Sequence, residues 1–246
     1  MAIPENPNTG RIIDYWLGGG HHLPADVDAA KAFERLYPGF PQVFAALREF
    51  LGRAVRAVAD HGTDQYLVLG AGVPTRGNVH EVVPARVLYT DIDLVNIELG
   101  RQILAGLPHV DYAYCDAADL GTLDQDAARG ILDLTRPIGV VMVGVSGFLD
   151  DRTAQRTLSE IYDWVPSGSH LVVDFDGEAV ESHPAVLSLL HRAGGVLHLR
   201  RPEQIRPLLG RWELTPEGVQ PVDLWRNRPA TRLDGVFMYG CLAAKP

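Results

Sequence analysis

The stretch 67–82 reads LVLGAGVPTRGNVHEV and decides the fold of this chain. An apolar run, expected to end a buried strand, leads directly into Gly70 and Gly72, and only a short helix is expected after Pro74. Because glycine has no Cβ, such a turn lets the backbone approach a nucleotide-like ligand closely. The stretch therefore predicts a strand, a glycine turn and a short helix that together form part of a ligand site.

Apolar runs and helical patterns alternate beyond this stretch. The runs expected to be strands are 66–69, 86–90, 112–115, 139–145 and 171–175, and the helical candidates between them are 78–83, 94–104, 125–134, 151–165 and 184–192. Apolar strands joined by helices form a parallel sheet covered on both faces. The segments 212–222 and 235–243 are strand-like with no clear helix between them, which favours an antiparallel pair at one edge. We therefore predict a seven-stranded, mostly parallel sheet with an antiparallel edge strand.

A helical pattern runs from about residue 12 to residue 61. Phe44, Leu47, Leu51, Val55 and Val58 recur at spacings of three and four before a terminating Gly62. Ahead of them, DYWLGGGHHLPAD (14–26) holds three consecutive glycines and two histidines, which indicates an irregular segment or a broken helix. We predict an N-terminal helical cap over 1–61, lying over the strand ends of a Rossmann-like domain over 62–246, as one structural unit.

Composition excludes some partners. The chain has 22 Lys and Arg against 31 Asp and Glu, a net charge of −9, which disfavours nucleic acid and anionic membranes. No apolar stretch approaches the roughly 18 residues that span a bilayer, and no signal peptide is recognised, so we expect a cytoplasmic protein. Cys115 and Cys241 have no paired spacing, and we expect no metal site. The sequence leaves a homodimer open.

Acidic residues at the next two strand ends extend the ligand site. Asp91 lies 21 residues after Gly70, where its carboxylate can accept hydrogen bonds from ribose hydroxyls. Asp116 could accept one from an adenine amino group, or cap the following segment. A pyrophosphate cofactor usually requires G-x-G-x-x-G at the start of a long helix. The sequence GAGVPTRG departs from that pattern and favours S-adenosylmethionine, in a sheet arranged as in class I methyltransferases.

The chain resembles the actinobacterial S-adenosyl methyltransferase family, once catalogued as a domain of unknown function. The resemblance rests on RIIDYWLGG, ADVDAA, FLGRAVR, LGAGVPTRGNVHEVVPARVLYTDIDLV and PVDLWR, and so covers most of the length. It implies that the cofactor is closed over by Tyr15 and Gly18. It further implies that the methionine end is held by Gly70, Ala71, Gly72, Thr75 and Asn78, the ribose by Asp91 and Asp93 with Ile92 between them, and the adenine by Asp116 and Ala117 above Val145 and Ser146.

The chain departs from that family at three polar positions. Val68 stands where members usually carry an acid that reaches the ammonium of the cofactor. Gly20, His21 and His22 replace a usual Lys-Asp-Asn, and Gly147 replaces a histidine common after the fourth strand. These changes keep a second hypothesis open, in which the fold is retained but the chemistry differs.

Histidines supply the candidates for a catalytic base. His21 and His22 lie in the glycine-rich segment near the expected site, and imidazole titrates near neutral pH. His80 lies on the short helix after the glycine turn, where Glu81 could orient it. The alternatives are that His21 and His22 are solvated loop residues and that His80 has a structural role. Methyl transfer needs in-line positioning and a base only when the acceptor must lose a proton.

Two further groups of charged residues are candidates for substrate contacts. Asp174 and Asp176 end the fifth strand, and we expect one to face the cleft and the other the far side of the sheet. The arginines of 197–211, among them Arg200, are expected on a solvated helix face.

The sequence favours an S-adenosylmethionine-dependent methyltransferase acting on a small molecule, with a role in specialised metabolism and S-adenosylhomocysteine as the product. The alternative is a member of the same fold with altered chemistry, either a non-methylating enzyme or a cofactor-binding regulatory module. A nicotinamide-dependent reductase is disfavoured by the interrupted glycine motif and by the lack of a Tyr-x-x-x-Lys pair.

Overall fold

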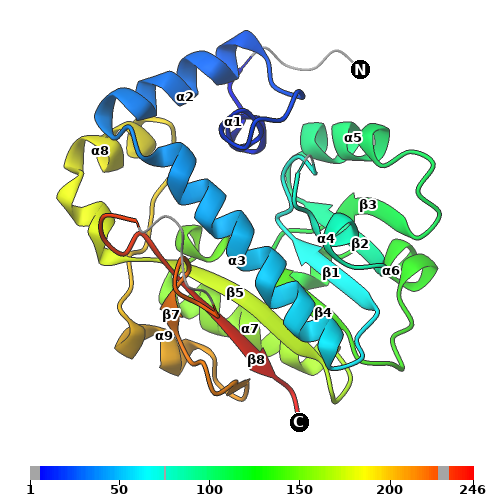
Figure 1. Ribbon diagram of the computed structural model, residues 1–246. Coiled ribbons are helices and arrows are strands. Elements are labelled where there is room, and N and C mark those ends of the chain that lie inside the picture. Colours follow the sequence, from blue (N-terminus) through cyan, green and yellow to red (C-terminus); the bar gives the residue numbers. More distant parts are fainter. Residues whose placement is uncertain (1–5, 75, 227–232) are drawn as a thin grey trace.

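The computed structural model describes residues 6–74, 76–226 and 233–246, which fold around one eight-stranded sheet (Figure 1). The spatial order is β3-β2-β1-β4-β5-β8-β6, with β7 also paired with β8. The strands are β1 (Gln65–Leu69), β2 (Arg86–Asp91), β3 (Val110–Tyr114), β4 (Gly139–Met142), β5 (His170–Asp176), β6 (Glu213–Leu214), β7 (Gln220–Pro221) and β8 (Met238–Ala244). Strands β1 to β5 are parallel, and β8 runs antiparallel to β5, β6 and β7.

The predicted fold class is confirmed, with two differences at the antiparallel end. The segment 212–222 forms two strands of two residues each, β6 and β7, with a turn at Gly218 (φ +66°) between them, which raises the predicted strand number by one. Both pair with β8, so β8 lies inside the sheet and not at its edge. Strand β4 ends at Met142, short of 145, and Gly144 follows with a left-handed φ of +79°.

Helices cover both faces of the sheet. They are α1 (Thr9–Trp16), α2 (Pro24–Leu36), α3 (Phe40–Asp60), α4 (Val79–Val82), α5 (Leu94–Ile103), α6 (Gln125–Ile131), α7 (Asp151–Trp164), α8 (Pro184–Arg192) and α9 (Pro202–Leu208), with short 3₁₀ turns η1 (Leu120–Thr122), η2 (Ser146–Phe148) and η3 (Glu178–Ser182). No helix in the described part of the chain is both long and apolar enough to cross a membrane.

The N-terminal segment divides into two parts. Helix α3 crosses one face of the sheet (Figure 1), and its predicted apolar positions Leu47, Leu51, Val55 and Val58 are buried there. Helices α1 and α2 instead lie over the carboxyl ends of the strands (Figure 1). A buried ion pair joins these two helices, with 2.7 Å between Arg11 Nε and Asp26 Oδ2.

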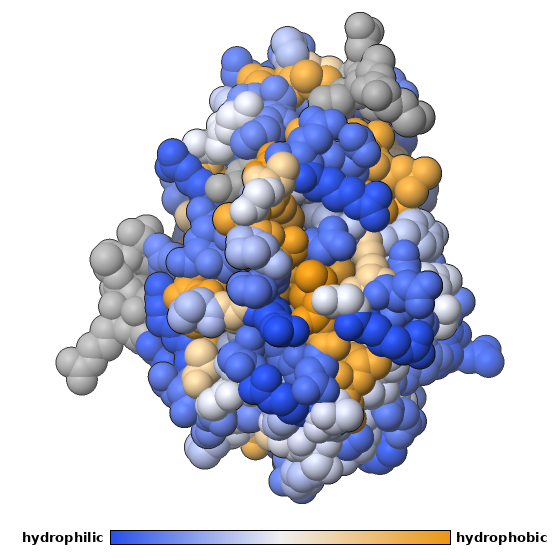
Figure 2. All heavy atoms as spheres, turned by 90° about the vertical axis from the view of Figure 1, so that its right-hand side faces the viewer, coloured by the Kyte–Doolittle hydropathy of each residue, from blue (hydrophilic) through white to orange (hydrophobic). Residues whose placement is uncertain are grey.

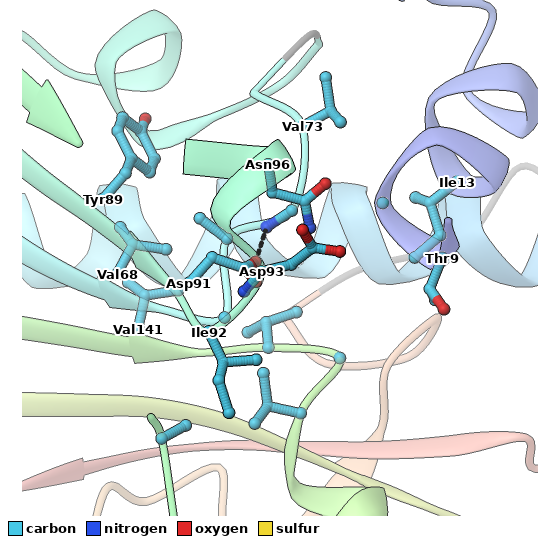
Figure 3. A pocket seen from close by; sticks show the side chains of 18 of the residues that line it. Thr9, Ile13, Val68, Val73, Tyr89, Asp91, Ile92, Asp93, Asn96 and Val141 are labelled. Atoms are coloured by element: carbon cyan, nitrogen blue, oxygen red, sulfur yellow. Dashed lines mark hydrogen bonds between the residues drawn. The ribbon is translucent and has the colours of Figure 1, made fainter. Parts of the chain in front are cut away.

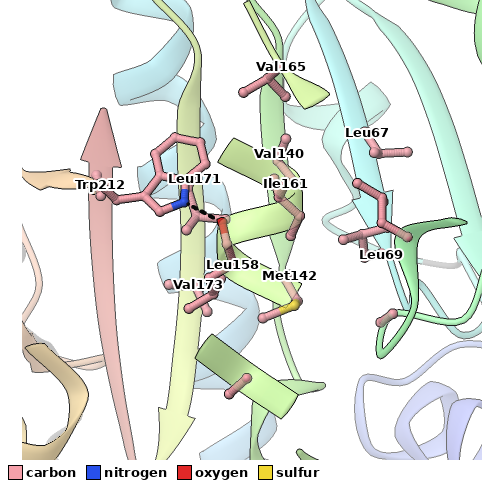
Figure 4. Close-up of a cluster of buried hydrophobic side chains, with 14 of the residues drawn as sticks. Leu67, Leu69, Val140, Met142, Leu158, Ile161, Val165, Leu171, Val173 and Trp212 are labelled. Atoms are coloured by element: carbon pink, nitrogen blue, oxygen red, sulfur yellow. Dashed lines mark hydrogen bonds between the residues drawn. The ribbon is translucent and has the colours of Figure 1, made fainter. Parts of the chain in front are cut away.

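The core has one apolar layer on each face of the sheet. Figure 4 shows the layer beneath α7, where Leu158 and Ile161 pack against strand residues such as Val140 and Leu171. Trp212 closes this layer and donates from Nε1 to the Leu158 carbonyl oxygen at 2.9 Å. Burying each of these aliphatic side chains contributes about 1.5–3 kcal/mol. The two layers hold the strands in place and so position the carboxyl ends of the strands, where the candidate functional site lies.

Candidate functional site

The carboxyl ends of β1, β2 and β4 open into a cavity of about 450 Å³ beneath α1 and the first half of α3. In Figure 3, Thr9 and Ile13 of α1 lie across it from strand residues such as Val68. On the face of the molecule that carries α5 and β3, hydrophobic residues are exposed in a hollow between hydrophilic rims (Figure 2). Ten of the residues predicted to bind the cofactor line this cavity: Gly70, Ala71, Gly72, Asn78, Asp91, Ile92, Asp93, Asp116, Ala117 and Val145.

The glycine turn after β1 forms the bottom of the cavity. Gly70 and Gly72 both adopt a φ of +62°, which favours glycine. A Cβ at Gly70 would lie 2.3 Å from Val145 Cγ2, and one at Gly72 would lie 3.3 Å from the Cα of Gly10 in α1. The Ala71 amide donates to the Thr90 carbonyl at 2.8 Å, which ties the turn to β2. The turn therefore needs glycine for its backbone geometry and for the close approach of its neighbours.

Asp91 is the last residue of β2, and its carboxylate is held in the wall of the cavity by hydrogen bonds. It is 6% exposed, and its Oδ2 accepts from the Gly72 amide while its Oδ1 accepts from the Asp93 amide, both at 2.8 Å. Burial raises the pKa of Asp91, and the two backbone hydrogen bonds, together with a third from the Asn96 side chain, oppose that rise. Since a carboxylate offers about four lone-pair positions, Asp91 keeps acceptor capacity for a ligand.

Two asparagines that sequence reasoning missed support the same wall. The Asn8 side-chain amide donates to Asp93 Oδ2, and Asn8 Oδ1 accepts from the Arg11 amide as the N-cap of α1. Asp93 Oδ1 caps α5 through the Val95 amide at 2.7 Å. Asn96 lies one turn into α5, and its buried Oδ1 has no hydrogen-bond partner among the described residues. The start of α1 is thus bound to the start of α5 across the cavity.

Asn78 presents an unused donor at the opposite end. Its Oδ1 accepts from Arg48 Nη1 of α3 at 2.7 Å, which leaves the Nδ2 donor buried with no partner among the described residues. Arg48 itself lines the cavity, and burial lowers its pKa. A cation and a free amide donor therefore face the end of the cavity nearest α3, and Asp91 and Asp93 face the other.

Val68 stands in the wall at the position where the family resemblance leads us to expect an acid. It is 5% exposed and lies beside Val141 and Val143, which also line the cavity. The wall here is apolar, so a cofactor ammonium would find no carboxylate at this position.

Asp116 and Ala117 follow β3 at the outer end of the cavity. Asp116 Oδ1 accepts from the Ala118 amide at 2.8 Å, so the side chain also stabilises its own turn. Ile92, 56% exposed, offers an apolar surface on the same side. Ser146 does not line the cavity, because it is fully buried with its hydroxyl donating to the Asp174 carbonyl oxygen.

Most of the segment 15–22 lies outside this cavity, and of its residues only Leu17 lines it. Tyr15 and Gly18 do not line it, and Thr75 falls outside the described residues. Asp14 Oδ2 accepts from the His21 amide and contacts His22 Nδ1, both at 2.8 Å, so the segment folds onto Asp14. Neither imidazole lines the cavity.

His80 is also directed away from the site. Its Nδ1 lies 2.7 Å from the hydroxyl of Tyr89, and Tyr89 stands between the imidazole and the cavity. Burial lowers the pKa of His80. The expected partner Glu81 instead closes a capping box at the start of α4, where its Oε2 accepts from the Asn78 amide at 2.9 Å. The structure therefore brings none of the three predicted base candidates to the cavity.

The structure corrects the interpretation of the fifth strand. Asp174 and Asp176 are two residues apart on β5, so they point to the same face of the sheet, the one covered by α3. Arg200, expected in solvent, is 2% exposed and donates to the carbonyl oxygens of Ser146 and Leu149 and to Asp151. A long-range contact with the segment after β4 explains its burial.

The mostly parallel sheet with its antiparallel end, and the cavity at the carboxyl ends of its strands, are those of the class I S-adenosylmethionine-dependent methyltransferase fold. The chain belongs to the S-adenosyl methyltransferase family, whose sequence model matches residues 4–246. This membership confirms two predictions: the family, which the sequence motifs indicated, and the cofactor, S-adenosylmethionine.

Solved structures agree with this assignment. A DUF574 family protein from Streptomyces avermitilis is 30% identical with a TM-score of 0.87, covering 98% of both chains. A candidate methyltransferase from Thermobifida fusca is 28% identical with a TM-score of 0.86, covering 98% of this chain and 95% of that one. Magnesium protoporphyrin IX methyltransferase from Synechocystis, with bound S-adenosylhomocysteine, shares the fold at 13% identity and a TM-score of 0.58, with coverages of 96% and 93%. No curated protein shows significant sequence similarity to the chain.

Proposed function

We propose that this protein transfers a methyl group from S-adenosylmethionine to a small molecule. The observation that carries the proposal is the buried Asp91 carboxylate, fixed by the Gly72 amide beside a turn in which a Cβ at position 70 would clash with Val145. A nucleoside can approach such a turn closely and place its ribose hydroxyls against the remaining lone pairs. The cofactor supplies a methyl carbon on a positively charged sulfur; as the acceptor atom bonds to it, the sulfur keeps the electron pair of the broken bond and the acceptor gives up one proton.

The nucleoside end of the cofactor fits the acidic side of the cavity. Asp91 and Asp93 would hold the ribose, and Ile92 with Asp116 would border the adenine. The apolar side chain of Ile92 provides a surface for a base, and its exposure lets a ligand bury it.

The methionine end fits the side nearest α3. Gly70 and Gly72 would accommodate the chain, the free Nδ2 of Asn78 would donate to it, and the Arg48 guanidinium would pair with the carboxylate. Because Arg48 is a cation of high intrinsic pKa, it suits a planar carboxylate. The unpartnered donor of Asn78 is a cost to the free protein that this ligand would relieve.

A second candidate function is a cofactor-binding protein that does not methylate. The observation in its favour is Val68, an apolar residue in the wall where a carboxylate is expected to reach the ammonium.

Titration calorimetry with S-adenosylmethionine and with S-adenosylhomocysteine tests both candidates. Heat with both ligands, together with release of S-adenosylhomocysteine when small-molecule acceptors are added, supports the methyltransferase. Heat with no release over a broad acceptor collection supports the binding protein. No heat with either ligand at millimolar concentration rejects both.

A further inference from the structure

A second cavity of about 330 Å³ adjoins the first one. It lies between α1, α2 and the start of α3 on one side and α8 on the other. The two cavities share the wall residues Thr9, Ile13, Phe44, Gly144 and Phe148. A molecule in the second cavity would therefore lie beside a cofactor in the first, and the volume lies in the range of about 300–1,000 Å³ that small-molecule sites occupy.

Aromatic rings from the N-terminal helices form one wall. Trp16 stacks on Phe40 with 5.2 Å between ring centroids and on Phe44 with 4.9 Å. Phe33 packs edge-on against Phe40 at 5.6 Å. Flat rings arranged in this way favour a planar apolar ligand, since aromatic pairs add about 0.5–1.5 kcal/mol to simple burial.

The opposite wall is aliphatic and aromatic as well. Val186, Leu189 and Leu190 of α8 line it. Tyr37 lies with its ring centroid 4.6 Å from His183 and 4.8 Å from Phe237. A strongly polar ligand such as a sugar would lose its hydration against these mostly apolar walls and gain few hydrogen-bond partners.

Asp176, at the end of β5, places one carboxylate in this apolar lining. It is 8% exposed, and its side chain accepts no hydrogen bond from another described residue. Arg200 does not neutralise it by contact, because the guanidinium is engaged by the carbonyl oxygens of Ser146 and Leu149 and by Asp151. Burial raises the pKa of Asp176 to about 6, and the charge of Arg200 opposes the rise.

Gly147 makes room for that carboxylate. A Cβ at position 147 would lie only 1.8 Å from Asp176 Oδ2, so a side chain there would displace the acid. The turn after β4 thus lets the carboxylate stand at the wall of the second cavity, which Gly144 also lines.

We propose that the second cavity binds the methyl acceptor, a flat aromatic molecule with one hydroxyl or amino group whose proton is held by the carboxylate of Asp176. This inference rests on the proposed function, because the acceptor must lie beside the cofactor. The hydroxyl or amino group donates its hydrogen bond to Asp176, which orients the acceptor atom toward the shared wall. As that atom gains the methyl group, Asp176 takes its proton and returns it to water.

Binding of matched ring compounds tests the inference without requiring turnover. The probes are 2-naphthol, 2-aminonaphthalene and 2-methoxynaphthalene, titrated by calorimetry into protein saturated with S-adenosylhomocysteine, with glucose as a polar control. We expect the naphthol, the amine or both to bind at least tenfold more tightly than the methoxy compound, and glucose not to bind. Whichever of the two binds more tightly identifies oxygen or nitrogen as the preferred acceptor atom.

Three variants locate the probes. Asp176→Asn should bring the hydroxyl and amino compounds to the affinity of the methoxy compound. Ala32→Trp, which fills the second cavity from α2, should abolish binding of all three, whereas Lys31→Trp on the exposed side of the same helix should leave binding unchanged. All three variants should retain S-adenosylhomocysteine affinity, which shows that they are folded.

Two outcomes would overturn the inference while leaving the proposed function intact. One is S-adenosylhomocysteine binding with no detectable binding of any ring probe. The other is ring binding that Ala32→Trp leaves unchanged. Failure of the wild-type protein to bind S-adenosylhomocysteine would instead reject the proposed function.

Discussion

Replacing Asp91 with alanine removes the carboxylate on which the proposed cofactor site depends. The side chain accepts two backbone hydrogen bonds at 2.8 Å, from Gly72 and Asp93, and it is 6% exposed. The substitution therefore has two separate effects. The free protein loses one hydrogen bond that orders the glycine turn and one that orders the start of α5, and the bound state loses the acceptor for the ribose hydroxyls.

Both effects have an expected size. Hydrogen bonds to a charged group contribute about 1.5–3 kcal/mol, and part of this is returned when water replaces the carboxylate. We expect Asp91→Ala to weaken S-adenosylhomocysteine binding by about 1–3 kcal/mol, which corresponds to a roughly 5- to 150-fold higher Kd by calorimetry. The free energy of unfolding in urea should fall by about 1–3 kcal/mol as well.

A pair of nucleosides separates the ribose contact from general damage to the turn. The wild-type protein should prefer adenosine to 2′,3′-dideoxyadenosine by at least tenfold, and Asp91→Ala should lose this preference. Asp111→Ala, on β3 and outside the cavity, is the matched control and should keep both the affinity and the preference. An unchanged Kd in Asp91→Ala, or a retained preference for adenosine, would refute the assignment of Asp91 to the ribose.

Two further predictions concern the strand ends. Gly70→Ala forces an L residue to φ +62° with its Cβ 2.3 Å from Val145 Cγ2, so the free energy of unfolding in urea should fall by about 1–3 kcal/mol and S-adenosylhomocysteine should bind at least tenfold more weakly. Gly130→Ala in α6, where a Cβ has open space, is the control and should raise the free energy of unfolding by about 0.5–1 kcal/mol. Equal effects of the two substitutions would contradict the reasoning. Burial, with the charge of Asp176 adding to it, raises the pKa of Asp174 to about 8, so this group favours the folded state most below its unfolded pKa of about 4 and loses that contribution as pH rises toward 8. Asp174→Asn should therefore remove a decline of about 3–4 kcal/mol in unfolding free energy between pH 5 and pH 8; parallel pH profiles for the two proteins would show that Asp174 is not the titrating group.

The parts of the site that were predictable lie at the ends of parallel strands. Gly70, Gly72, Asp91 and Asp116 follow consecutive apolar runs, and parallel strands must bring their carboxyl ends to one edge of the sheet. This geometry needs no knowledge of distant contacts. The apolar face of α3 was equally clear from its spacing.

The parts that were not predictable depend on contacts between distant segments. Asn8 and Arg48 reach the cavity only because α1 and the first half of α3 pack above it, and no local pattern in the sequence marks them. Arg200 looks like a solvated residue until the turn after β4 supplies carbonyl oxygens for its guanidinium. The histidines were predicted from residue type and from their nearness in sequence to the site, whereas local hydrogen bonds to Asp14 and Tyr89 account for His22 and His80.

The crystal structure of the protein with S-adenosylhomocysteine tests the central claim most directly. We predict that the nucleoside lies in the cavity at the ends of β1, β2 and β4, with both ribose hydroxyls within about 3.2 Å of the Asp91 carboxylate and the adenine between Ile92 and Asp116. A nucleoside bound elsewhere, or an Asp91 side chain with no contact to the ribose, would contradict it.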